Sequence, residues 1–218
     1  MSYLELHARS AFSFLRGASN PEDLAVAAQK NGMPALALCD RDGVYGSARM
    51  HAKAKENGLR AIVGAELTLE CGSVLPVLVK SRTGYQNLCR LITASRLRGT
   101  KHESSIRWDE LPQYSEGLVA LTGDEEGILR QPEGAGTPQA VDELVKAFGA
   151  DNVFVEIQRH HQRGEVWRNQ WLVDLAQAKR LPLLATNGVV YAAPEQRGAF
   201  DVLTCMRHHT HLDAAGGC

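Results

Sequence analysis

The 218-residue sequence has no long hydrophobic run, and no stretch approaches the roughly 18 apolar residues that a membrane-spanning helix needs. Residues 1–7 have neither a basic start nor an apolar core, so they do not resemble a signal peptide. Apolar residues make up 44% of the chain and charged residues 22%. This composition is typical of a soluble globular protein, and the length suffices for one α/β domain with a sizeable core.

Cysteine pairs with metal-binding or redox spacing are also missing. The five cysteines are odd in number and include no C-x-x-C pair, and Cys39 lies in an apolar run that suits a buried thiol. These features predict a reduced, cytoplasmic setting. The formal net charge of −1 gives no general attraction to nucleic acid. A DNA-binding role therefore needs a local basic patch or another part of the molecule.

Strand-like and helix-like segments alternate along the chain. Residues 35–39 form a continuous apolar run between Pro34 and Asp40, which is typical of a parallel strand buried on both faces. Residues 98–116 are expected to be mostly loop, and 131–138 a connection rich in Gly and Pro. The other strands are predicted at 3–7, 61–69, 74–79, 118–121, 153–158 and 183–185, and the helices at 19–32, 45–57, 84–97, 139–148, 166–179 and 195–206. This repeated order favours a parallel barrel or a doubly wound sheet.

Polar residues stand at or just beyond the ends of several predicted strands. They are His7, Asp40, Glu66, His160 and Asn187. Barrel enzymes carry their chemistry at the carboxyl ends of their strands, so these side chains are expected to converge on one rim. Imidazole and carboxylate groups suit zinc or manganese.

Several of these residues also have a simpler structural explanation. His7 suits a strand-end histidine bonded to the backbone. Asp40 precedes Arg41-Asp42-Gly43 and suits a turn or a helix cap. His160 and His161 suit a solvated turn. Glu66 is harder to explain in this way, because a carboxylate between apolar neighbours is costly to bury without a partner.

Several stretches of the sequence resemble a known family. They are residues 5–19, 35–40, 62–66, 155–160, 185–187 and 201–207. Their order and wording are similar to the PHP (polymerase and histidinol phosphatase) domain that begins bacterial DNA polymerase III alpha subunits, above all the error-prone, damage-associated alpha subunit. The resemblance covers essentially the whole chain. Residues 12–17, Phe-Ser-Phe-Leu-Arg-Gly, are specific to the error-prone branch, and residues 98–150 match more loosely.

The resemblance implies a distorted (β/α)7-type, TIM-like barrel formed by residues 1–218 as a single PHP domain. In active members of the family, a trinuclear metal site hydrolyses phosphoester bonds. The palm, fingers and thumb of the polymerase are absent from this chain, so it is not expected to polymerise DNA alone. The expected partners are the remainder of the polymerase, DNA and damage-tolerance proteins, and no membrane.

Only part of the family's metal-ligand set matches this sequence. The matching residues are His7, Asp40, Glu66 and His160, and the substituted positions hold Arg9, Arg16, Arg41, Gly188 and Val190. Arginine stays protonated and cannot ligate a metal. We therefore expect a degenerate site with no cofactor, or at most a single zinc or manganese ion.

The arginines suggest two roles. They could partly replace the metals electrostatically, with Arg9 or Arg41 paired with Asp40 or Glu66. Alternatively, they could bind a phosphate or the DNA backbone.

For the domain as a whole, the sequence favours a structural module of an error-prone DNA polymerase. The alternative is an active metal-dependent phosphoesterase or 3′–5′ exonuclease with a reduced site. A free-standing hydrolase of small phosphates is disfavoured, because the resemblance to polymerases runs to the C-terminus.

Overall fold

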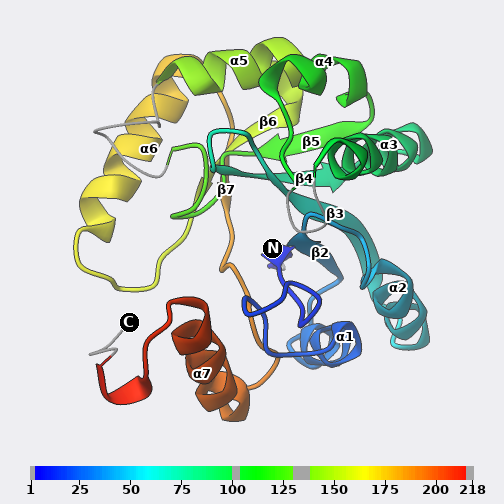
Figure 1. Cartoon of the computed structure of the whole chain (residues 1–218), viewed down its shortest axis with the longest axis vertical. Coiled ribbons are helices and arrows are strands. Elements are labelled where there is room, and N and C mark those ends of the chain that lie inside the picture. Colours follow the sequence, from blue (N-terminus) through cyan, green and yellow to red (C-terminus); the bar gives the residue numbers. More distant parts are fainter. Residues whose placement is uncertain (1–2, 100–103, 130–137, 215–218) are drawn as a thin grey trace. The chain divides into compact units, whose positions relative to one another are not determined.

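A computed structural model describes residues 3–99, 104–129 and 138–214. These residues form seven strands and seven α-helices, and the two kinds of element mostly alternate along the chain. Figure 1 labels these elements. The strands form a mixed sheet in the order β1-β2-β3-β4-β5-β6-β7, which is the order of the sequence. The α/β class and the seven strands of the predicted barrel type are thereby confirmed. By its internal contacts the chain divides into two compact units, Met1–Ile62 with Gly188–Cys218 and Val63–Asn187.

The first unit is built on two parallel strands, β1 (Glu5–Ala8) and β2 (Ala35–Arg41). All residues of β2 except Arg41 are buried, as expected for a strand covered on both faces. Leu36 and Leu38 of β2 pack in one core with Leu24 and Met50. These two come from α1 (Pro21–Lys30) and α2 (Ser47–Glu56), and the unit also contains η3 (Pro194–Gln196), α7 (Arg197–Arg207) and η4 (Leu212–Ala214).

Local sequence explains the bounds of α1. At the N-cap, the Asp23 carboxylate accepts a hydrogen bond from the Asn20 backbone N–H at 3.3 Å, and Pro21 occupies the first turn, where its missing N–H is not needed. Gly32 follows the helix with a φ of +68°, a conformation that glycine adopts without steric cost. Both ends therefore follow the signals in the sequence.

The second unit carries most of the sheet. Strand β3 (Arg60–Thr68) pairs antiparallel with β4 (Val74–Val79), and β4 pairs antiparallel with β5 (Leu118–Leu121). Parallel pairing then joins β5 to β6 (Val153–Ile157) and β6 to β7 (Leu183–Ala185). The helical segments are α3 (Arg82–Arg98), η1 (Trp108–Glu110), α4 (Leu111–Tyr114), α5 (Pro138–Phe148), η2 (Ala150–Asn152) and α6 (Glu165–Lys179).

The segment expected to be loop at 98–116 contains two short helical turns, η1 and α4. The carboxylate of Glu110 accepts a hydrogen bond from the backbone N–H of Arg107 at 3.0 Å, and Leu111 is buried. Turns this short do not produce the apolar periodicity that identifies longer helices. Of the connection expected at 131–138, only Pro138 falls among the described residues. In the described ranges, no helix combines the length and hydropathy that a bilayer crossing requires.

Candidate metal-binding site

Glu66 lies within β3 and is fully buried. Its neighbours Ala65 and Leu67 are also fully buried, and Pro76 of β4 stands opposite it in the antiparallel register. An ionised carboxylate in such surroundings loses its hydration, so it must interact with a proton, a cation or hydrogen-bond donors. The location of Glu66 therefore points to a site rather than to a solvated surface.

Asp124 lies three residues beyond the end of β5, in a tight turn. Gly123 has a φ of +82°, and a Cβ atom there would come within 2.8 Å of the Gly127 Cα atom, so the turn requires glycine. The Asp124 Oδ1 atom accepts a hydrogen bond from the Glu126 backbone N–H at 2.9 Å. Only 8% of Asp124 is exposed. The turn thus fixes a buried carboxylate in a defined orientation.

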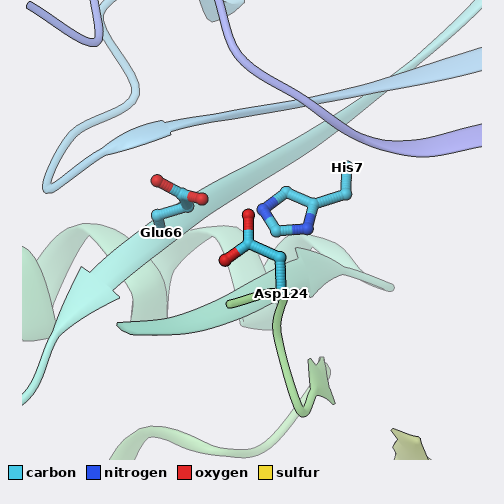
Figure 2. Close-up of side chains that lie close together, drawn as sticks. All are labelled: His7, Glu66 and Asp124. Atoms are coloured by element: carbon cyan, nitrogen blue, oxygen red, sulfur yellow. The ribbon is translucent and has the colours of Figure 1, made fainter. Parts of the chain in front are cut away.

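His7 lies in β1 and is fully buried. Its backbone N–H donates to the Glu5 Oε1 atom at 2.8 Å, and the Tyr3 hydroxyl donates to Glu5 Oε2 at 2.6 Å. One ligand atom each of His7, Glu66 and Asp124 lies within 4.8 Å of the other two, and Figure 2 shows these side chains directed toward one another.

The three donors form a chemically coherent set. Two carboxylate charges within 4.8 Å repel each other by about 3 kcal/mol at the effective dielectric constant of a partly buried site. A positive charge nearby relieves this repulsion. One imidazole and two carboxylates are suitable ligands for zinc or manganese, and three protein donors leave coordination positions for water or an anion. The residues therefore fit a divalent cation.

Asp40 is not one of these three residues. Its carboxylate is buried and accepts hydrogen bonds from two serines of the loop that follows β1. The Ser10 backbone N–H donates to Oδ1 at 2.8 Å, and the Ser13 hydroxyl donates to the same atom at 2.7 Å. The Ser10 hydroxyl lies 2.9 Å from Oδ2. These contacts join the end of β2 to the loop at residues 9–18.

His160 is exposed, and it also lies outside the group of three. The backbone N–H groups of His160 and His161 donate to the two carboxylate oxygens of Glu165, at 2.5 and 2.8 Å. The Nε2 atom of His160 lies 3.1 Å from Gln158 Oε1. Partial burial raises the pKa of Glu165, but hydrogen bonds from the two amides outweigh it and hold the pKa below its ordinary value. In this structure, residues 160–165 form the turn that enters α6.

The five substituted positions all belong to the first unit. Arg9 and Arg16 lie in the loop after β1, Arg41 ends β2, and Gly188 and Val190 lie between β7 and η3. The backbone N–H of Arg9 donates to the Val189 carbonyl, and Ala18 donates to the Val190 carbonyl, both at 2.8 Å. Arg41 donates its backbone N–H to the Ser13 hydroxyl at 3.0 Å. Arg16 donates its backbone N–H to Ser13, and Gly188 has a φ of +55°. Pairing of Arg9 or Arg41 with Asp40 or Glu66 stays a prediction.

Sequence reasoning missed Asp124. The residue follows a correctly predicted strand, so the same strand-end criterion that selected Asp40 applies to it. Thr122 and Gly123 separate it from the end of the strand. The serine partners of Asp40 were missed as well, because contacts across 27 and 30 residues leave no periodic signal.

Comparison with known proteins identifies the family. The sequence-family model of the PHP domain matches residues 5–160 of this chain. An error-prone DNA polymerase of Symbiobacterium thermophilum is 36% identical over 98% of this chain, and one of Cutibacterium acnes is 37% identical over 99%. The chain spans only 21% and 20% of those two proteins, about a fifth of the length of the curated relatives that it matches.

A solved structure from Bifidobacterium adolescentis, assigned as a metal-dependent phosphoesterase, shares the fold with a TM-score of 0.63. Sequence identity is 14%, and the match covers 93% of this chain and 96% of the other. At this identity the likeness concerns the fold alone. Together with the sequence matches, it confirms the predicted resemblance: the chain belongs to the PHP domain family.

Proposed function

We propose that residues 1–218 are the single N-terminal PHP domain of an error-prone DNA polymerase that acts in replication and translesion repair synthesis. The share of the relatives' length that the chain matches supports this proposal. The remainder of such a polymerase would be its first partner, with DNA and damage-tolerance proteins as further partners in the cytoplasm. The domain's own contribution is to bind one divalent cation that stabilises the fold.

The observation that carries this proposal is the buried group of His7, Glu66 and Asp124. Three donors of suitable chemistry lie within 4.8 Å of one another, which is close enough for one ion to contact all three after small side-chain adjustments. A cation would offset the repulsion between the two carboxylates. Because binding to the folded state alone stabilises it, such an ion would serve a structural purpose.

A structural role is favoured over hydrolysis by the residues at the other ligand positions. Arg9, Arg16 and Arg41 bring fixed positive charges to positions where active members carry ligands, and arginine cannot replace a ligand. A multinuclear cluster needs more donors than the three that come together among the residues that the structure describes. We therefore infer a reduced site for one zinc or manganese ion, in which Asp40 and His160 have structural roles.

The proposal predicts stabilisation by metal. Zinc or manganese at about 100 times its dissociation constant should add about 2.7 kcal/mol of unfolding free energy, which raises the melting temperature by roughly 5–11 °C. Glu66→Gln and Asp124→Asn should abolish this rise. The matched control is Asp109→Asn, because the Asp109 side chain is 73% exposed and should not alter the rise. An equal rise in the wild type and in both site variants would refute the proposed ligands.

A second function, metal-dependent hydrolysis of phosphodiesters, is favoured by one feature of the same group. Three protein donors leave coordination positions that a water and a phosphate oxygen can fill, and a bound cation would supply a hydroxide nucleophile there. Release of nucleotides from the 3′ end of a DNA strand with added manganese distinguishes the two functions. Metal-dependent turnover that is lost in Asp124→Asn would show a catalytic site. Metal-induced stabilisation without turnover would show a structural one.

A further inference from the structure

Three aromatic side chains protrude from two neighbouring loops of the first unit. Phe14 is 80% exposed, Tyr45 is 59% exposed and Phe12 is 39% exposed. The guanidinium of Arg49 lies 5.6 Å from the centroid of the Phe12 ring, a cation–π contact. We refer to Phe12, Phe14, Tyr45 and Arg49 as the aromatic surface. Large aromatic rings this exposed are unfavourable in water and are common at binding surfaces.

The loop that carries Phe12 and Phe14 is held firmly. Ser10 and Ser13, on either side of Phe12, both donate to the buried carboxylate of Asp40. A Cβ atom on Gly17 would come within 2.2 Å of the Ser10 carbonyl oxygen, so the chain passes too close for any other residue. Leu15 has a φ of +61°, which is strained for a residue with a side chain. The rings are therefore displayed on a rigid loop.

The second loop is tied to the first at one residue. The Ser13 hydroxyl donates to Asp40, and it accepts the backbone N–H of Arg41 at 3.0 Å. The turn after Arg41 carries Tyr45, whose ring lies so close to Gly43 that a Cβ atom there would meet it at 2.1 Å. Both loops thus present aromatic rings from one connected piece of structure.

The same segments concentrate positive charge. Residues 9–18 and 41–56 contain six arginines and lysines against two acidic residues, Asp42 and Glu56, in a chain of net charge −1. Two of these cations form ion pairs, Arg49 with Glu22 and Lys53 with Glu56. Arg9 is buried, so the cations of these segments that reach the surface are Arg16, Arg41, Arg49, Lys53 and Lys55. A phosphate backbone complements this charge, whereas an apolar protein groove does not.

We propose that the aromatic surface binds single-stranded nucleic acid. Exposed bases would stack on Phe14 and Tyr45, and the surrounding arginines and lysines would attract the phosphates. Rigid aromatic rings beside cations are the usual means by which proteins hold unpaired bases without sequence preference. In a duplex the base faces are already stacked, so a single strand is the form that fits. The four residues of the aromatic surface lie wholly in the first unit, and none of them belongs to the proposed metal site.

The test is fluorescence anisotropy with labelled oligo-thymidine, which has little structure of its own, against a duplex of equal length. The wild type should bind the single strand more tightly than the duplex, and salt should weaken the binding. Phe14→Ala should weaken binding about tenfold, as expected for the loss of one stacked base. Phe14→Leu should weaken it too, because an aliphatic side chain of similar size cannot stack.

Trp167→Ala is the matched control. Trp167 is another highly exposed aromatic residue, 82% exposed on α6 of the second unit, and its loss should leave binding unchanged. Equal melting temperatures of the Phe14 variants and the wild type would show that the fold is intact. No binding of oligo-thymidine, or equal binding by wild type and Phe14→Ala, would overturn the proposal. If Phe14→Ala instead weakens association with a polymerase segment and leaves oligo-thymidine binding unchanged, the surface is a protein interface.

Discussion

Replacing Asp40 with alanine should destabilise the protein strongly, because this carboxylate joins two loops inside the first unit. It accepts from the Ser10 backbone N–H, the Ser10 hydroxyl and the Ser13 hydroxyl, at 2.7–3.0 Å. Hydrogen bonds to a charged group contribute about 1.5–3 kcal/mol each. Three such donors at the lower value give about 4.5 kcal/mol. For a chain of this length the melting temperature should fall by roughly 9–18 °C.

The assay is thermal unfolding followed by circular dichroism, in buffer with a metal chelator. Asp109→Ala is a suitable control, because the side chain is 73% exposed and its ion pair with Arg107 should contribute no more than about 1 kcal/mol. If Asp40 acted only as a metal ligand, its replacement would have little effect once metal is removed. A fall of less than about 2 °C in chelator would therefore refute a loop-joining role.

Two further predictions concern backbone and pH. Gly84→Ala should destabilise the protein by about 2 kcal/mol or more, because its Cβ atom would stand 1.9 Å from the carbonyl oxygen of Gly117. Gly198→Ala in α7 is the control, because a Cβ atom there would have no atom within 4 Å, and it should be neutral or stabilise by up to about 1 kcal/mol. Urea unfolding measures both changes. Glu165 has a folded-state pKa below its ordinary value of 4.5, so its stabilisation is present above that pH and is lost as the pH falls through the folded-state pKa. In the wild type, protection of the amides of residues 160 and 161 from hydrogen exchange should decrease as the pH is lowered through the folded-state pKa. In Glu165→Gln, this protection should not change with pH.

The strands and most helices could be predicted because their signals are local. The apolar run in β2 between Pro34 and Asp40 predicts a strand buried on both faces, and the structure confirms it. The caps at Asn20 and Gly32 define α1 in the same way. The short turns of η1 and α4 lack any such period and were expected to be loop.

The site was less accessible to sequence reasoning, because it depends on contacts between distant segments. Glu66 is recognisable as a carboxylate within an apolar strand. Asp124 follows a correctly predicted strand, but the turn at Gly123 determines its direction. Asp40 shows the opposite case, since its position at a strand end fits a ligand, while Ser10 and Ser13 give it a structural explanation. A residue's place along a strand does not determine which partners its side chain meets.

The central claim is that His7, Glu66 and Asp124 hold one divalent cation. The most direct test is elemental analysis of the protein after exposure to zinc or manganese and exhaustive dialysis, beside Glu66→Gln and Asp124→Asn treated identically. Our account predicts about one ion per chain in the wild type and nearly none in either variant, with Asp109→Asn unchanged. Metal-free wild-type protein, or equal metal content in the wild type and both site variants, would contradict it.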